Sequence, residues 1–346
     1  MSAYAVVGPE RHGVVIHALR LAGAAPDLGA GLVRISATDP VTVATDLRLA
    51  LAGHDSAMIH VTDHLLGSSP SDAADLVEDL ARTTALALCL HDIPQPEEGE
   101  ARHARRRAAY RRFVESAAVV VVASEHERAL LDRCLDGDSP DTPDTPVVVL
   151  PLPVERMHGA APERQVSRQT APHVGVLGFL YPGKGLEDVI DAAAGAAGPG
   201  REITVVNVGG VSRGHESMVD DLTTRALERG IRFVVSGYVP DRDLTRALWD
   251  VDVPVAAHRH VSASGSINTW IAVGRRPILL DGDYTRELAT RMPGAVTVVE
   301  GAAGLAAAIG SALDDPGSTW IDDAVVLTPT WAASAADHEA VLRSVS

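Results

Sequence analysis

Short apolar runs alternate with longer amphipathic stretches along nearly the whole chain. The apolar runs lack the polar–apolar alternation of a half-exposed strand and are typical of strands buried on both faces of a parallel sheet. Strands that alternate with helices predict βαβ units and an α/β fold. The predicted strands are residues 3–8, 33–37, 56–62, 85–91, 118–124 and 147–151, followed by 173–180, 202–209, 232–237, 253–257, 277–281 and 295–300.

The pattern divides into two similar halves. We expect an N-terminal domain of residues 1–155 and a second domain of residues 173–330, joined by a linker, residues 156–172, whose sequence is polar and irregular. Residues 331–346 predict one more helix after a loop. Two parallel α/β domains imply a cleft between them at the carboxyl ends of both sheets, because ligands of such folds bind there.

Composition narrows the class of protein. The formal net charge of −16 argues against nucleic acid and anionic membranes as bulk partners. The two cysteines give no disulfide framework. No apolar run reaches the roughly 18–20 residues of a membrane span, and the first residues lack the basic region of a signal peptide. We therefore expect a soluble, cytoplasmic protein without an integral membrane segment.

Lys184 is the only lysine of the chain, beside 29 arginines. It lies in a glycine-rich turn between the predicted strand 173–180 and a predicted helix from Leu186 to Ala197. A strand, a glycine-rich turn with a lysine, and a helix can place a cation and helix amides against a phosphate, with Gly178 opening the turn. The alternative is an ordinary surface lysine in a connection between strand and helix.

A second loop carries hydroxyl groups and a glycine. Ser262, Ser264, Gly265 and Ser266 lie where a further helix is predicted to begin. Hydroxyls and free amides at a helix N-terminus form an anion site, so this loop is a candidate for binding a diphosphate. The alternative is that Ser264 or Ser266 only caps the helix.

The first half offers weaker candidates. His91 ends a buried strand, where its ring can hydrogen-bond a polar ligand, although a purely structural histidine is an equal alternative. His12, Gly13 and Asp63 follow two other predicted strands and are further candidates, with Asp63 a possible base. Six arginines predict a basic helix that is a solvated face, or less favourably a contact with an anionic acceptor or a membrane surface. They are Arg102, Arg105, Arg106, Arg107, Arg111 and Arg112.

The motifs of the second half, taken in their order along the chain, resemble the donor-binding domain of GT-B glycosyltransferases, most closely the large retaining family four. The matching segments are residues 178–185, 208–210, 236–240, 243–244, 252–253, Gly265 and 274–277. The resemblance implies two facing Rossmann-like domains and a nucleotide-sugar donor. It places the diphosphate at Gly178, Lys184 and the serine loop, and the nucleotide base beside Tyr238. In the first half, it implies that His91 bonds a sugar hydroxyl or the acceptor and that His12, Gly13 and Asp63 lie on the acceptor side. It also implies that the helix from Trp331 crosses back to the first domain.

The sequence departs from the family pattern at three positions. The family usually has two glutamates where this chain has Ser262 and Trp270, and an arginine where it has Phe179. We expect a glycosyltransferase that moves a sugar to an unknown small-molecule or envelope acceptor, metal-independent and retaining, with His91 and Lys184 as catalytic residues and no cofactor. The alternatives are a non-catalytic homologue that binds or regulates a partner, and an enzyme of this fold with another reaction on a nucleotide sugar.

Overall fold

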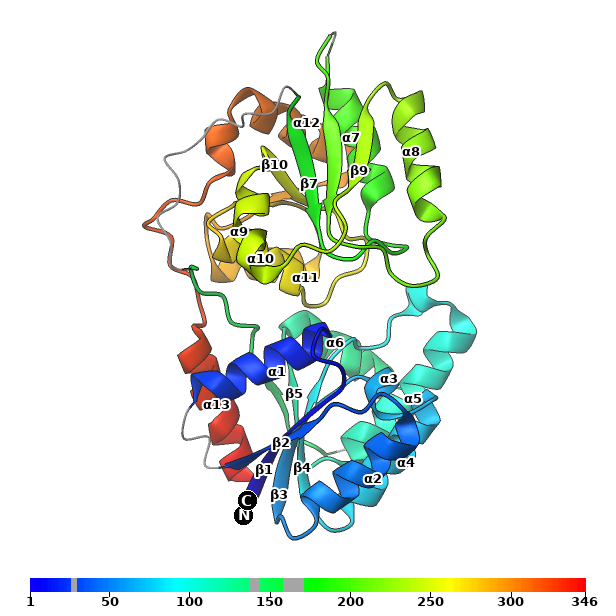
Figure 1. Cartoon of the computed structure of the whole chain (residues 1–346). Coiled ribbons are helices and arrows are strands. Elements are labelled where there is room, and N and C mark those ends of the chain that lie inside the picture. Colours follow the sequence, from blue (N-terminus) through cyan, green and yellow to red (C-terminus); the bar gives the residue numbers. More distant parts are fainter. Residues whose placement is uncertain (26–29, 137–143, 158–170, 199) are drawn as a thin grey trace. The chain divides into compact units, whose positions relative to one another are not determined.

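The chain folds into two compact α/β units (Figure 1). The structure is a computed structural model that describes residues 1–25, 30–136, 144–157, 171–198 and 200–346. Unit 1 comprises Met1–Pro153 together with Pro329–Ser346, and unit 2 comprises Val154–Thr328. Most of the predicted linker 156–172 lies outside the described residues.

Each unit contains a six-stranded sheet in which every pair of neighbouring strands is parallel. The strand order is β2-β1-β3-β4-β5-β6 in unit 1 and β12-β11-β10-β7-β8-β9 in unit 2. Every strand predicted from the sequence overlaps an observed one. The predicted α/β class with parallel sheets is therefore confirmed.

The four inner strands of unit 1 are rich in valine, leucine and alanine and are buried on both faces, as parallel strands between helix layers must be, whereas the two edge strands are partly exposed. The strands of this unit are β1 (Ser2–Val7), β2 (Ala30–Ile35), β3 (Ser56–Val61), β4 (Ala85–Leu90), β5 (Val119–Val122) and β6 (Val147–Val149). The helices are α1 (Gly13–Ala24), α2 (Pro40–Leu51), α3 (Asp63–Leu66), α4 (Pro70–Ala81), α5 (Glu100–Ser116), α6 (Glu125–Leu135) and α13 (Trp331–Ser344), with a 3-10 turn η1 (Pro96–Glu98).

The two faces of the unit 1 sheet have separate apolar cores. Leu47 of α2, Val77 of α4 and Phe113 of α5 pack in the core of one face. On the other face, Met58 of β3 packs in a core with Leu342, from the opposite end of the chain. The terminal helix α13 thus completes unit 1 beside α1 (Figure 1).

Unit 2 repeats the plan with its own helices. Its strands are β7 (His173–Leu177), β8 (Thr204–Val208), β9 (Arg232–Val235), β10 (Val253–Ala256), β11 (Ile278–Leu280) and β12 (Thr297–Val299). Its helices are α7 (Leu186–Ala196), α8 (Met218–Glu228), α9 (Asp241–Trp249), α10 (Gly265–Ala272), α11 (Asp283–Arg291) and α12 (Gly301–Asp314), with a 3-10 turn η2 (Pro316–Thr319). Helices α7, α8 and α12 cover one face through residues such as Val189, Leu222 and Leu305.

Candidate functional site

The turn after β7 is built so that it can pass close to a neighbouring loop. Gly178, Gly183 and Gly185 all have positive φ angles, of 112°, 90° and 81°. A Cβ atom on Gly185 would lie 1.8 Å from the carbonyl oxygen of Ala257, so only glycine fits there. The close approach brings Lys184, inside this turn, against the loop that follows β10.

Lys184 is buried, with 3% of its surface exposed. Its Nζ lies 2.9 Å from Nε2 of His258 and 3.5 Å from Oγ of Ser266. Gly178 lies against the same ammonium, since a Cβ there would be 3.1 Å from Nζ. The structure therefore brings together Gly178, Lys184 and Ser266, which the sequence analysis had selected from two separate loops.

The ammonium of Lys184 is not neutralised by an acid. Burial lowers its pKa to about 8, and among the described residues it forms no ion pair. Burial, and then the positive charge of Lys184, lower the pKa of His258 to about 3. At neutral pH a charged lysine thus donates to a neutral imidazole, and its remaining N–H groups are left for Ser266 or an anion.

The serine loop forms the N-terminus of α10. Ser264 caps this helix, because its Oγ accepts a hydrogen bond from the amide of Ile267 at 3.3 Å. Its hydroxyl also lies 3.1 Å from that of Ser266. Ser262 is buried, and Gly265 leaves open space beside its Cα. The cap predicted as the alternative role of Ser264 is present, and it lies at the helix end closest to Lys184.

Sequence reasoning passed over two residues that hold this site together. His258 was not selected as a site residue, although it is the closest side-chain partner of Lys184. Asn207 of β8 was not selected; its Nδ2 donates to the carbonyl oxygens of Gly178 and Gly209, both at 3.1 Å. A polar residue inside an otherwise apolar strand was the available signal for Asn207.

Exposed aromatic residues gather at the carboxyl ends of β7 and β9. Phe179, Tyr181 and Tyr238 are the exposed aromatic residues among the described part of the chain. Nζ of Lys184 lies 5.7 Å from the centre of the Tyr181 ring. Trp270, at the position of a family glutamate, is instead fully buried with Leu248 in an apolar cluster.

Two arginines of unit 2, Arg275 and Arg259, are engaged by other partners. Arg275 is 1% exposed, and its guanidinium donates to the carbonyl oxygens of Val251 and Asp252. Arg259, beside His258, forms a two-bond ion pair with Asp188 of α7, each bond 2.9 Å long. Lys184 is accordingly the cation of this turn that remains available to an anion.

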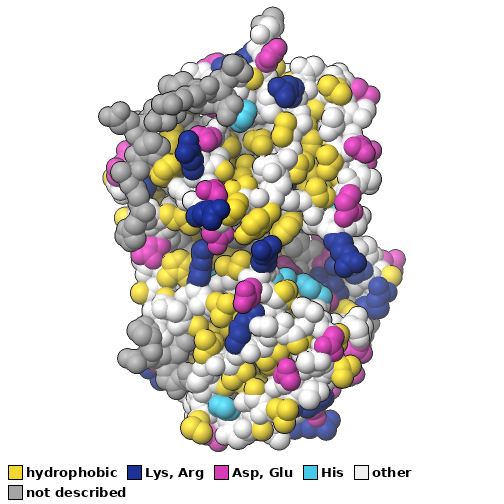
Figure 2. Space-filling model, viewed as in Figure 1, with side chains coloured by type: hydrophobic (Ala, Val, Ile, Leu, Met, Phe, Trp, Pro, Cys, Tyr) yellow, Lys and Arg dark blue, Asp and Glu magenta, His cyan; other side chains and the backbone are white. Residues whose placement is uncertain are grey.

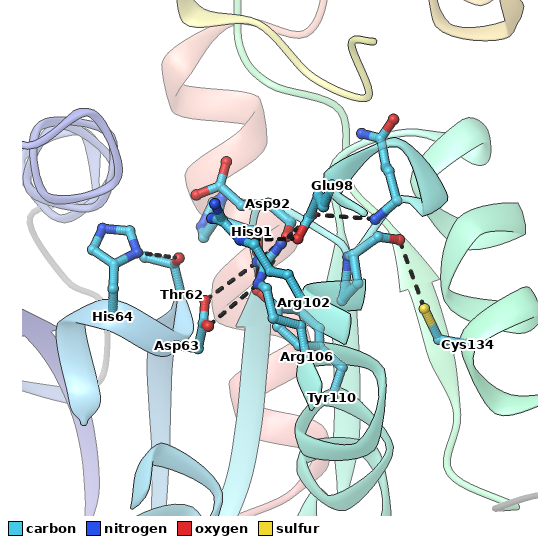
Figure 3. A network of polar contacts seen from close by, with 12 residues as sticks. Thr62, Asp63, His64, His91, Asp92, Glu98, Arg102, Arg106, Tyr110 and Cys134 are labelled. Atoms are coloured by element: carbon cyan, nitrogen blue, oxygen red, sulfur yellow. Dashed lines mark hydrogen bonds and ion pairs between the residues drawn. The ribbon is translucent and has the colours of Figure 1, made fainter. Parts of the chain in front are cut away.

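In unit 1, Asp63 belongs to a structural ion-pair network (Figure 3). Nε and Nη2 of Arg106 each lie 3.2 Å from a carboxylate oxygen of Asp63. Arg106 also pairs with Glu98 and donates to the carbonyl oxygen of Asp92. Both carboxylate oxygens of Asp63 thus accept hydrogen bonds from Arg106, which does not suit a general base. Asp63 is therefore not part of the site proposed below.

The same network changes the interpretation of the basic helix. Arg106 of α5 is buried rather than solvated, and Arg112 pairs with Asp75 and Glu78 of α4. Basic and acidic side chains are interspersed on the face that Figure 2 shows. Along the described residues, no helix combines the length and the apolar character needed to cross a membrane.

His12 and Gly13 lie at the start of α1. Nδ1 of His12 accepts from the amide of Val14, and its Nε2 lies 3.0 Å from Nε2 of His64. Burial, and then His64, lower the pKa of His12. Gly13 has open space around its Cα. The two residues therefore lie at an accessible helix N-terminus, which leaves room for a ligand.

His91 follows β4 and is half-buried in a cluster of histidines. Its Nε2 lies 3.0 Å from Nδ1 of His60, while His17 of α1 and His338 of α13 pack their rings against His60. Burial lowers the pKa of His91 to about 4, so the ring is neutral at pH 7.

Across the described ranges, no three His, Cys, Asp or Glu side chains are arranged to hold a metal ion.

Comparisons with known proteins support the fold. No protein-family model matches the chain. No curated protein matches it either. Among solved structures, HepE of Anabaena in complex with UDP and glucose has a TM-score of 0.67 at 15% identity, over 99% of this chain and 95% of that one. Sucrose-phosphate synthase of Thermosynechococcus elongatus has a TM-score of 0.68 at 14% identity, over 99% of this chain and 96% of that one. Trehalose-6-phosphate synthase of E. coli, bound with UDP-2-fluoro glucose, has a TM-score of 0.64 at 12% identity, over 100% of this chain and 96% of that one. The chain therefore has the fold of GT-B glycosyltransferases, as expected from its motifs.

Proposed function

We propose that this protein is a glycosyltransferase that takes its sugar from a nucleoside-diphosphate donor. The observation that carries the proposal is the buried, unneutralised ammonium of Lys184 between Gly178 and the N-terminus of α10. A buried cation without a counter-ion is costly, and an anionic ligand would offset that cost. The fold shared with structures that contain UDP adds support.

Each group of this site has a role in the proposed reaction. Negative charge grows on the diphosphate as the bond to the sugar breaks, and fixed cations and amides stabilise that charge. Lys184 would donate to a phosphate oxygen, and Ser264, Ser266 and the free amides of α10 would bind the others. Since these groups supply the positive charge, the proposed transfer is metal-independent and needs no cofactor besides the donor.

The remaining assignments concern the ends of the donor and the acceptor. We propose that the exposed ring of Tyr238 flanks the nucleotide base and that His91 hydrogen-bonds the sugar or the acceptor. His12 and Gly13 remain candidates for the acceptor side. Ser262 would take over part of the role of the missing glutamate. Retention of configuration is proposed on the family resemblance.

The test is binding of UDP, GDP, ADP, TDP and CDP measured by thermal shift. HepE and the E. coli enzyme were solved with UDP or a UDP-sugar, so we expect UDP to stabilise the native protein most. Lys184→Ala should remain folded and lose this stabilisation. Arg242→Ala, which removes an exposed charge of α9 paired with Asp243, is the matched control and should retain it. An unchanged UDP response in Lys184→Ala would refute the phosphate assignment.

A second function is favoured by Trp270. Its indole is fully buried and supplies no carboxylate where the family carries a glutamate, which fits a homologue that binds a nucleotide sugar without transferring it. Stabilisation by UDP together with no turnover or hydrolysis of any UDP-sugar would favour this second function. Release of UDP from a UDP-sugar by the wild type, but not by Lys184→Ala, would favour the transferase.

A further inference from the structure

Three side chains of unit 1 form a hydrogen-bonded chain that ends at His91. Tyr4 of β1 and His60 of β3 are both buried. The hydroxyl of Tyr4 lies 2.6 Å from Nε2 of His60, and Nδ1 of His60 lies 3.0 Å from Nε2 of His91. Three neighbouring strands, β1, β3 and β4, therefore connect the interior of the sheet to the end of β4.

The direction of the chain follows from the tyrosine. In the described part of the protein, the bond to His60 is the one hydrogen bond found for the Tyr4 hydroxyl. Burial raises its pKa well above the ordinary value, so the hydroxyl keeps its proton. A buried O–H that did not donate would lose its hydration without replacement. Tyr4 must therefore donate, and Nε2 of His60 must accept.

The hydrogen bond from Tyr4 then determines the tautomers of both imidazole rings, His60 and His91. Burial, and then the neighbouring histidines, hold the pKa of His60 well below its usual range, so the ring is neutral and carries one proton. With Nε2 accepting, that proton is on Nδ1 and points at Nε2 of His91. His91 is neutral as well, so its own proton must be on Nδ1.

The neighbouring histidines do not offer an alternative path. His17 packs edge-on against His60, with ring centres 5.6 Å apart, and His338 stacks on it at 6.0 Å. His338 Nδ1 is hydrogen-bonded to the carbonyl oxygen of Ser334, at 2.7 Å. Both nitrogens of His60 are already used, so these rings pack around the chain without joining it.

We propose that Tyr4 and His60 are positioning residues that hold His91 as its Nδ1–H tautomer, so that His91 presents a hydrogen-bond donor to the ligand. Within the described residues, no partner is found for Nδ1 of His91, and the side chain is half-buried, so this N–H remains available. A donor there suits a hydroxyl oxygen of a sugar or acceptor. That use of the N–H rests on the proposed function, whereas the tautomer does not.

The experiment is a long-range ¹H–¹⁵N spectrum of the histidine rings in the full-length protein at pH 7.5 without ligand. His91→Gln assigns the His91 signals. We expect His91 to carry its proton on Nδ1, opposite to the Nε2–H form that free histidine favours in water. A wild-type spectrum with His91 protonated on Nε2 would overturn the proposal, and this result does not depend on a change at Tyr4 or His60.

Tyr4→Phe tests the cause. Without the hydroxyl, Nε2 of His60 loses its donor and the chain can reverse, so His91 should move towards the Nε2–H form. Tyr110→Phe is the matched control, because it removes a buried hydroxyl that reaches the backbone oxygen of His91 (2.5 Å, Figure 3) and not its ring. An unchanged His91 tautomer in folded Tyr4→Phe would also overturn the proposal. Because no nucleotide is present, failure of the proposed function would leave this result unaffected.

Discussion

At the scale of single residues, the site depends on where one charge is placed. Lys184 is held away from water by a turn whose glycines allow it to pass under the loop after β10. Its nearest partner, His258, is neutral and therefore leaves the positive charge in place. A lysine in such a position has a pKa low enough to titrate within the working range of an enzyme assay.

The affinity for UDP should therefore depend on pH. The pKa of Lys184 in the free protein is about 8, and only the ammonium form attracts the diphosphate. We expect a constant Kd between pH 7 and about 8 and a loss of roughly tenfold per pH unit above it, measured by calorimetry. The phosphate group itself is fully ionised in this range, since its last pKa is about 6. A Kd that stays flat to pH 9.5 would contradict the assignment of Lys184.

The glycines of the turn give a second prediction at this scale. Gly183→Ala meets no atom within 4 Å and should cost only the left-handed backbone, about 1–2 kcal/mol. Gly185→Ala has the same backbone cost and also a clash with the Ala257 carbonyl oxygen, so it should destabilise unit 2 distinctly more. Tryptophan fluorescence during guanidinium unfolding reports this, because Trp249, Trp270 and Trp320 all lie in unit 2. Equal losses for the two variants would show that the turn can shift away from the loop.

At the scale of elements, four histidines join the terminal helix to the sheet of unit 1. They come from α1, β3, the end of β4 and α13, and the ring centres of the other three lie within 6.0 Å of the centre of the His60 ring. Burial lowers the pKa of all four, which are His17, His60, His91 and His338. Asp92 and Asp337 favour protonation, whereas Arg20 and the neighbouring His12 oppose it; Tyr4 and Cys89 lie beside the cluster with raised pKa values.

Unit 1 should consequently lose stability in acid. Unfolded histidines bind protons near pH 6.5, whereas the folded cluster stays neutral to about pH 4 at His91. Between these values the unfolded state binds more protons, so the free energy of unfolding is highest above pH 6.5 and falls as pH falls. Each pKa unit of lowering is worth about 1.4 kcal/mol. Hydrogen exchange of α1 and α13, corrected for the intrinsic rate, should accelerate between pH 6.5 and 4.5.

One variant isolates the cluster. His17→Phe keeps an aromatic ring against His60 and Trp331 but removes a group that takes up a proton, so the acid effect on α13 should shrink. His103→Phe, on α5 of the same unit, is the control and should leave the acid effect unchanged. Acid acceleration of equal size in both variants would place its origin outside the cluster.

At the scale of the whole molecule, the chain builds unit 1 from its two ends. Residues from Pro329 onward belong with Met1–Pro153, and the hydroxyl of the last residue, Ser346, lies 2.7 Å from that of Ser56 and 2.9 Å from that of Ser2. The family resemblance implied such a return for the helix from Trp331. The apolar pattern alone did not, because one amphipathic helix at the end of a chain fits the face of either sheet.

The sequence by itself determined the strands, the parallel sheets and the turn around Lys184. Buried parallel strands need continuous apolar runs, and tight turns need glycine, so both can be predicted from short stretches of the sequence. The tertiary structure decided which polar groups meet. His258 is 74 positions from Lys184 in the sequence, and Arg106 is 43 from Asp63. Such pairs depend on which strand lies beside which, so only the folded sheet could assign Asp63 to an ion pair with Arg106 and Tyr4 to a hydrogen bond with His60.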